Sequence, residues 1–336
     1  MIMVLIIHAD FLSLGGPATR PSGVEELVNS VTRTWIEMLG LVAVNVFVLI
    51  SGWFGIKASL RGACNFLFQV FAIGLFALMI KLLAYPPPFN TLNIKDLACM
   101  FGATPGMWFV PSYLCLYLLA PLMNYFCENT GKAAVRNVII CFFLFQTVWG
   151  WIGGVGNIHG GYSAISFIGL YMLARYLRLY CDTSGIRRWT LLYLGMSITL
   201  TIYYYIQSGL PLAGMAAINY CNPLVIIEAV ALLLLFSNLH IRQSNIINYV
   251  ASSCFAVYLF HSAEPVMPWF KQFNADVYQA THGVLTLLAM GGIVMTFFIV
   301  AILLDQPRKW LWRIVGSRLV TRLEALSARI GVRSAD

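Results

Sequence analysis

Apolar segments long enough to cross a lipid bilayer recur along this chain. An α-helix rises about 1.5 Å per residue, so about 20 residues span the roughly 30 Å hydrocarbon layer. Hydrophobic residues make up 60% of the sequence and charged residues 10%, whereas a typical soluble domain is about 25% charged. Lipid offers the backbone no hydrogen-bond partners, so these segments predict helices and an all-α polytopic membrane bundle. The segments are Thr34 to Ile56, Cys64 to Ala84, Met107 to Phe126, Ala134 to Gly153, Ser163 to Tyr180, Trp189 to Gln207, Met215 to Leu239, Ile246 to Pro265 and Gly283 to Leu304.

The N-terminal residues form one more apolar segment, which is too short to span alone. As a helix, Met1 to Leu14 would reach only about 21 Å. The segment lacks the basic region and cleavage site of a signal peptide, so we expect it to be retained. Counting it as a crossing predicts about ten transmembrane helices, of which the first lacks its N-terminal half.

Basic residues gather on one side of the membrane when successive loops are assigned to alternate sides. With the C-terminus in the cytoplasm, 16 of the 21 Lys and Arg residues lie inside, as the positive-inside rule expects. The outer residues are Arg20, Arg33, Lys81, Lys95 and Lys271. This bias favours ten crossings with both ends in the cytoplasm, so the N-terminal segment should be a true crossing.

The C-terminal residues are basic and amphipathic. Leu311, Val315, Leu319 and Leu323 lie near one helical face, with arginines beside them. We therefore expect residues 1–306 to form the transmembrane domain and residues 307–336 a basic amphipathic cytoplasmic tail. The tail is either a helix lying on the anionic inner leaflet or a frayed end.

Several classes of site and protein lack support in the sequence. The eight cysteines include no C-x-x-C pair, so we expect no disulfide framework and no metal site. The chain contains no G-x-S-x-G, P-loop, H-E-x-x-H or G-x-G-x-x-G motif. We therefore expect a lipid bilayer as its environment and no nucleic-acid partner, while the oligomeric state stays open.

Ionisable side chains inside apolar segments are costly and so point to function. His8 is the strongest candidate, because a neutral imidazole suits general-base work on a hydroxyl and is buried without the cost of an ion. Asp10, two residues later, would not share its helical face. His261 either orients a substrate or binds the end of its own helix, and Glu228 is either a proton relay or a contact between helices. Each histidine could instead have a purely structural role, in which its ring forms a hydrogen bond with a neighbouring carbonyl.

A second group of candidates is polar, small or aromatic. Asn45 and Trp108 could donate hydrogen bonds to an oxyanion. Ser51 and Gly52 permit close approach of the backbone and so indicate a site of close helix packing. Lys57 and Arg61 would share one face if their helix continued, and could bind phosphates of a nucleotide-like donor, although the positive-inside rule already accounts for charges there. Trp53, Trp108, Tyr113 and Tyr117 fit interfacial belts or sugar-stacking platforms.

Taken in order, several segments resemble the acyltransferase 3 family of membrane proteins. They are "MIMVLIIH", "VNVFVLISGWFGI", "WFVPSYLCLYLLAPLMN", "GGYSAISFIGLYMLARYLR", "NPLVIIEAVALLLLFSNL" and "FAVYLFHSAEP". The resemblance implies a membrane O-acyltransferase of about ten helices in the bacterial inner membrane. It would move an acyl group, usually acetyl, from cytoplasmic acyl-CoA to a hydroxyl of a cell-surface glycan or its lipid-linked precursor, without a permanently bound cofactor.

The resemblance also implies roles for particular residues. His8 corresponds to the catalytic histidine of the first helix, and Lys57 and Arg61 lie near the family's basic pair after Ser51 and Gly52, so these last four residues are the predicted binding site for acyl-CoA. His261 corresponds to the histidine of a Tyr-x-x-His pattern that begins at Tyr258, with either acceptor orientation or a structural role. The family places a basic residue eleven positions before its histidine, and that position lies before Met1. Either about ten further residues, with a basic one among them, are encoded upstream, or the chain is a degenerate member of the family.

Two rival functions fit parts of the sequence. A carrier or flippase for a lipid-linked saccharide would use the same aromatic and small residues but needs no catalytic base. A glycan polymerase or glycosyltransferase would use larger outer loops rich in charged residues, and the outer loops here are short. The acyltransferase interpretation accounts best for His8.

Overall fold

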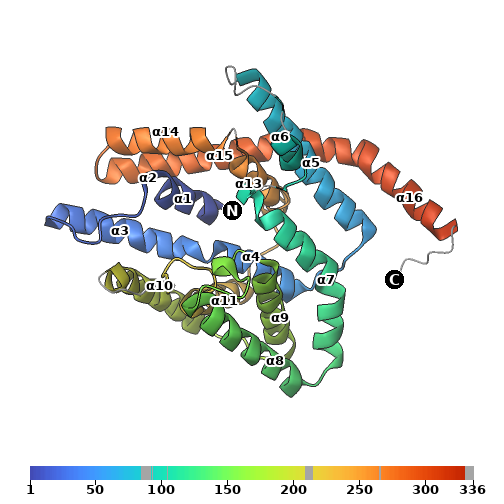
Figure 1. The fold of residues 1–336 in the computed structure, drawn as a ribbon, viewed down its shortest axis with the longest axis horizontal. Helices are drawn as coiled ribbons and strands as arrows, with labels where there is room; N and C mark the ends of the chain where they lie inside the picture. The colour runs from blue at the N-terminus through green and yellow to red at the C-terminus, as the bar shows by residue number, and fades with distance from the viewer. Residues whose placement is uncertain (85–91, 93, 104, 209–214, 265, 330–336) are drawn as a thin grey trace.

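The computed structural model describes residues 1–84, 92, 94–103, 105–208, 215–264 and 266–329. Every regular element in this part of the chain is helical (Figure 1). The N-terminal half contains α1 (Ile2–Ala9), α2 (Phe11–Leu14), α3 (Val24–Leu41), α4 (Ala43–Phe54), α5 (Leu60–Ala84), α6 (Ile94–Met100), η1 (Pro105–Met107), α7 (Phe109–Asn129), α8 (Lys132–Phe145) and η2 (Gln146–Ile152). The C-terminal half contains η3 (His159–Gly161), α9 (Ala164–Tyr180), α10 (Ile186–Ser208), α11 (Pro223–Ser237), α12 (Asn245–Ala251), α13 (Cys254–Ser262), α14 (Met267–Ala280), α15 (Val284–Leu311), η4 (Trp312–Gly316) and α16 (Ser317–Arg329).

Several helical stretches are long and apolar enough to cross a membrane. Among the described residues there are five: Val24–Phe54, Leu60–Ala84, Phe109–Asn129, Lys132–Ile152 and Val284–Ala325. A sixth results if Asn245–Ser262 and Met267–Ala280, which meet at 84°, form one span. The predicted all-helical polytopic membrane architecture is thus confirmed. The number of ten crossings stays a prediction.

The predicted span from Ile246 to Pro265 is not one straight helix. It is divided into α12 and α13 by Ser252 and Ser253. Lys309 Nζ lies 2.6 Å from both serine hydroxyls, so a side chain of another helix, α15, binds the two residues at this break. Pro265, predicted to end the helix, lies outside the described residues, and α13 itself ends at Ser262. Neither piece is long enough to span alone.

The predicted span from Met215 to Leu239 begins later than expected. Its helix α11 starts at Pro223, because Asn222 caps it by accepting a hydrogen bond at 3.0 Å from the backbone N–H of Leu224. A proline is favourable at this first helical position, where its missing N–H has no helical partner to lose. The remaining helix has 15 residues.

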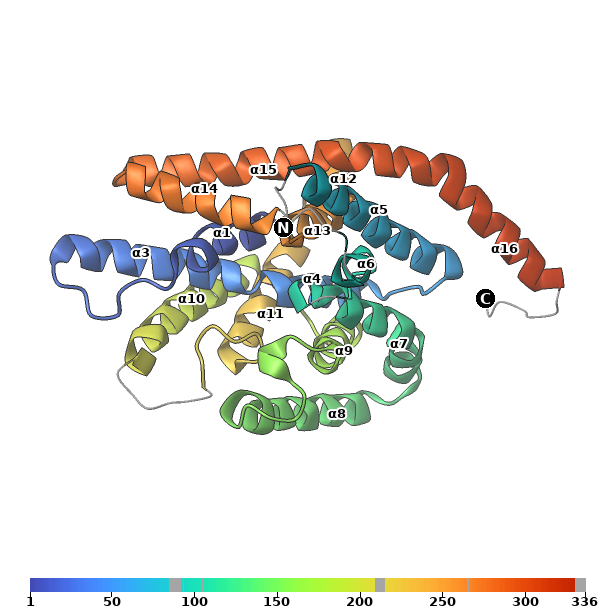
Figure 2. The same cartoon turned by 45° about the horizontal axis from the view of Figure 1, so that its top comes forward.

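The C-terminal helices form one long course along the molecule. Figure 2 shows α15 running along one side and continuing into α16, with α8 on the opposite side. The predicted domain boundary after residue 306 falls inside α15, and Arg308, just beyond it, is buried. The division into a transmembrane domain and a cytoplasmic tail stays a prediction.

Buried apolar side chains form two main clusters. One joins α4, α7, α9 and α11, with Leu49 and Phe167 among its fully buried members. The other joins α1, α5, α13 and α15, with Leu5 and Val257 at its centre. Because α1 and α13 share the second cluster, their C-terminal ends lie together although they are far apart in the chain.

Candidate active site

His8 and His261 meet inside the second apolar cluster. His8 lies in the last turn of α1 and His261 in the last turn of α13. His8 Nδ1 is 2.5 Å from His261 Nε2, so the rings share a hydrogen bond, and their centroids are 4.7 Å apart. One ring must donate an N–H while the other accepts with a lone pair. The two histidines that the sequence singled out separately therefore form one hydrogen-bonded pair.

Aromatic rings surround the buried member of this pair. His261 is fully buried and packs edge-on against Phe270 and Phe297, with centroids 4.7 Å and 5.7 Å away. Its Nδ1 has no hydrogen-bond partner among the described residues. His8 is only partly buried. His8 is thus the more exposed member of the pair, and His261 is the fully buried one.

An ion pair anchors the chain directly after His8. Arg33 on α3 donates to Asp10 Oδ1 from Nε at 2.7 Å and from Nη2 at 2.5 Å, and Nη2 also donates to the Gly15 carbonyl at 2.8 Å. The hydroxyl of Ser13 donates to the His8 carbonyl at 2.6 Å. These bonds satisfy backbone groups at the end of α1. Asp10 therefore pairs with Arg33 and not with His8.

A second acidic side chain, that of Glu37 in α3, is buried beside this ion pair. Glu37 lies one helical turn after Arg33 and is 6% exposed, and its Oε2 has no hydrogen-bond partner among the described residues. Sequence reasoning overlooked both residues, because Arg33 was counted as an outer loop residue. The available signal was the i, i+4 spacing of an acid and a base around the predicted start of a span at Thr34.

The candidate oxyanion and acceptor residues lie in a separate aromatic group. Trp108 contacts Tyr162 and Tyr220, with centroids 4.5 Å and 6.3 Å away. Asn45 Nδ2 donates to the backbone carbonyl of Tyr220 at 2.9 Å. Tyr258, three residues before His261, contacts Phe109 at 5.5 Å between centroids. Asn45 is therefore already engaged with the backbone, whereas Tyr258 links the aromatic group to α13.

Ser51 and Gly52, two of the residues predicted to bind the acyl donor, both contact neighbouring helices. Tyr113 and Ser51 hydroxyls lie 3.1 Å apart. A Cβ on Gly52 would clash with the carbonyl oxygen of Tyr171, so α4 and α9 pack closely at this glycine. The packing interpretation of Gly52 thus has direct structural support.

Lys57 and Arg61 do not share a helical face, contrary to the expected continuation of the helix. Helix α4 ends at Phe54, Gly55 follows with φ of +73°, and α5 starts only at Leu60. Arg61 donates to the Thr321 hydroxyl at 2.8 Å and lies 3.6 Å from Glu324, both on α16. The positive φ, which glycine adopts without strain, turns the chain out of the helix before Lys57.

Glu228 lies apart from the histidine pair. It is fully buried in α11 within the first apolar cluster, and neither carboxylate oxygen has a hydrogen-bond partner among the described residues. The described part of the chain also holds no group of three or more His, Cys, Asp or Glu side chains arranged to bind a metal ion.

Comparison with known proteins gives one match, which covers most of the chain. The family model described as an acyltransferase domain, that of acyltransferase 3, matches residues 1–305. No curated protein and no solved structure matches the chain. The matched range includes α1, α13 and nearly all of the buried clusters. The chain therefore belongs to the acyltransferase 3 family and is a multi-pass membrane acyltransferase.

Proposed function

We propose that this acyltransferase moves an acyl group, in the simplest case acetyl, from acyl-CoA to a hydroxyl of a cell-surface glycan or its lipid-linked precursor. The observation that carries the proposal is the hydrogen-bonded pair of His8 and His261. Acyl transfer to a sugar hydroxyl needs a base, because the hydroxyl must lose its proton as it attacks the thioester. A partly exposed imidazole held by a buried one meets this need.

The geometry favours His8 as the base. If its Nδ1–H donates to His261 Nε2, the Nε2 lone pair of His8 is left for the acceptor hydroxyl. The hydroxyl oxygen then bonds to the thioester carbonyl carbon while its proton passes to His8. The carbon–sulfur bond breaks, and the CoA thiolate takes that proton back. The products are an ester and free CoA, and His8 returns to its neutral form.

His261 is the positioning residue in this scheme. It is held by Phe270 and Phe297 and touches His8 but no outer surface. A fixed second imidazole selects the tautomer and the orientation of the first, as orienting partners do for catalytic histidines. For the developing oxyanion we assign the indole N–H of Trp108, because the Asn45 amide already donates to the backbone.

The donor and the membrane sidedness follow from charge. Basic residues gather on the side assigned to the cytoplasm, where acyl-CoA is available, so we place the donor there and the glycan acceptor on the opposite side. Lys57 is exposed in the turn after α4 and remains a candidate contact to the donor. The membrane is then the bacterial inner membrane, with the C-terminus in the cytoplasm.

Replacement of the two histidines tests the reaction. His8→Ala should lower acyl transfer by a factor of about 10² to 10⁴, which is the range for loss of general acid–base catalysis. His261→Ala should lower the rate as well, because the base loses its orientation. Acyl incorporation into surface glycan, followed by mass spectrometry in cells with each variant, is the measurement.

A third histidine supplies the control. His282 is exposed and lies before α15, so His282→Ala should keep full activity. Undiminished acylation by His8→Ala would contradict the proposal. A wild-type protein that changes the sidedness of a lipid-linked saccharide without any acyl-sized mass change would instead indicate a carrier.

A further inference from the structure

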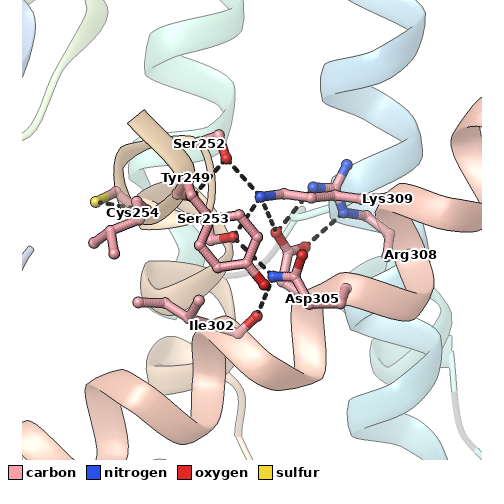
Figure 3. A network of polar contacts seen from close by, with 10 residues as sticks. Tyr249, Ser252, Ser253, Cys254, Ile302, Asp305, Arg308 and Lys309 are labelled. Atoms are coloured by element: carbon pink, nitrogen blue, oxygen red, sulfur yellow. Dashed lines mark hydrogen bonds and ion pairs between the residues drawn. The ribbon is translucent and has the colours of Figure 1, made fainter. Parts of the chain in front are cut away.

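A cavity away from the histidine pair lies between α5, α12 and the junction of α15 with η4. Its volume is about 270 Å³. Its lining residues include Asn65, Gln69, Arg308, Lys309, Trp312 and Arg313. Figure 3 shows the polar network along one wall, where the side chains of Arg308 and Lys309 converge on Asp305. None of these lining residues takes part in the proposed acyl-transfer step.

The charges around the cavity do not cancel. Arg308 binds Asp305 through two hydrogen bonds of 2.6 Å and 3.0 Å, which satisfy both carboxylate oxygens. Lys309 lies 3.6 Å from the same carboxylate and 2.6 Å from each of the two serine hydroxyls at the break before α13. Arg313 has no hydrogen bond or ion pair from its guanidinium to any described residue. Three cationic side chains line the cavity, and one carboxylate, that of Asp305, binds two of them, so the site carries a surplus of positive charge.

A buried amide in the wall also lacks a partner. Gln69 is 7% exposed, and its Nε2 has no hydrogen-bond partner among the described residues. One turn before it, Asn65 Oδ1 is buried and equally unpaired. A buried polar group without a partner destabilises the fold, so its retention at a cavity wall points to a ligand that supplies the missing bond. The Gln69 amide offers a donor, as an anion requires.

The opposite wall is held in a fixed position. The ring of Trp312 packs against Phe68 with centroids 5.4 Å apart. A Cβ on Gly316 would clash with this ring, so only glycine lets the indole fold back over η4. The segment η4 is a π-helix, a local irregularity that is often found at functional sites. The cavity is therefore formed before any ligand arrives.

We propose that this cavity is a binding site for a phosphate group. Guanidinium and ammonium groups bind phosphate oxygens through charge-assisted hydrogen bonds. Lys309 and Arg313, from α15 and η4, supply such charged donors, and the Gln69 amide of α5 supplies a neutral one. The volume is slightly below the range of about 300–1,000 Å³ for sites that enclose a small molecule. It fits the phosphate-bearing end of a larger ligand, with the rest outside.

Two kinds of ligand present such a phosphate. One is the acyl-CoA donor, an identification that rests on the proposed function. Ser253, which binds Lys309, and His261 lie at opposite ends of α13, about 12 Å apart along the helix axis. The histidine pair is therefore within the length of the long arm of a donor anchored here. The other is the headgroup of an anionic phospholipid.

Ligand binding to the full-length protein in lipid-free detergent tests the site. Coenzyme A and inorganic phosphate are titrated by calorimetry, and retention of phosphatidylglycerol is measured by native mass spectrometry against phosphatidylcholine. Arg313→Gln should weaken binding of the true ligand about tenfold, as expected when one hydrogen bond from a charged group is lost. Binding should also weaken as salt is added. Tighter binding of coenzyme A identifies the acyl-CoA donor as the ligand of the cavity. Preferential retention of phosphatidylglycerol identifies an anionic phospholipid as that ligand.

Two further variants separate ligand binding from folding. Arg318→Gln removes an exposed arginine of α16 that does not line the cavity, and it should bind as the wild type does. Gln69→Met keeps the volume of the side chain but removes its unpaired donor, so binding should fall while thermal stability holds or rises. A purely structural Gln69 would leave binding unchanged.

The outcomes for this site and for acyl transfer are independent. Binding of coenzyme A by a wild-type protein that transfers no acyl group would support the phosphate site and overturn the proposed function. The phosphate site is overturned if every phosphate ligand binds Arg313→Gln or Gln69→Met as tightly as it binds the wild type. This holds whatever the acyl-transfer activity.

Discussion

Asp10 and Arg33 form a largely buried ion pair beside the candidate base. Their side chains are 13% and 12% exposed, and Arg33 also binds the Gly15 carbonyl. Removing one partner of such a pair leaves the other charge buried without compensation, which costs about 3–5 kcal/mol. At the scale of single residues, this pair therefore controls how the chain leaves α1 and how His8 is presented.

Arg33→Gln should accordingly destabilise the protein by several kcal/mol and reduce activity. Asp10→Asn combined with Arg33→Gln removes both charges and should cost less than the sum of the two single changes. Thermal unfolding of the three variants in detergent, followed by tryptophan fluorescence, measures this coupling. Strictly additive losses would show that the two charges do not interact.

At the scale of elements, the close packing of α4 against α9 depends on Gly52. The carbonyl of Tyr171 occupies the space that a Cβ would need, and small residues at such positions let membrane helices approach closely. The loop after α4 is also bound to α9, through a hydrogen bond of 2.8 Å from the Ile56 N–H to the Tyr171 hydroxyl. The loop that carries Lys57 is thus held by α9.

Gly52→Ala should therefore lower the free energy of unfolding by about 1–3 kcal/mol, the usual cost of overpacking. Gly195→Ala on α10 is the matched control, because nothing lies within 4 Å of the position that its Cβ would take. The control should be neutral or slightly stabilising, since alanine favours helix over glycine. Equal melting temperatures for both variants would contradict the packing role of Gly52.

At the scale of the whole molecule, the placement of charge predicts how the protein sits in the membrane. The basic residues after α4, at the start of α8, at the end of α9, and at the end of α15 and along α16 belong to the side assigned to the cytoplasm. Figure 2 shows α16 at the edge of the molecule beyond the end of α15, a position open to an amphipathic helix that lies along a membrane surface. The histidine pair and the phosphate cavity would then lie at different depths.

Reporter fusions check this orientation. A fluorescent protein fused after Asp336 should fold and fluoresce, because it stays in the cytoplasm, whereas alkaline phosphatase at the same site should be inactive. An exported reporter inserted at Asn157, in the loop before η3, should show the opposite result. Active phosphatase at the C-terminus would overturn the predicted sidedness.

The sequence by itself determined the helical membrane architecture and the two histidines worth testing. An apolar segment in lipid must form its backbone hydrogen bonds within its own helix. Most predicted spans therefore coincide with helices. It could not place helix breaks such as Ser252 and Ser253, because these depend on Lys309 from another helix.

Only the tertiary structure decided which polar groups meet. His8 and His261 are 253 residues apart in the chain, and their contact follows from the packing of α1 against the same cluster as α13. Packing between helices likewise places Arg33 and Glu37 beside Asp10. It also forms the cavity at Arg313. A hydrogen bond forms only within about 3 Å, and local periodicity carries no information on distances between helices.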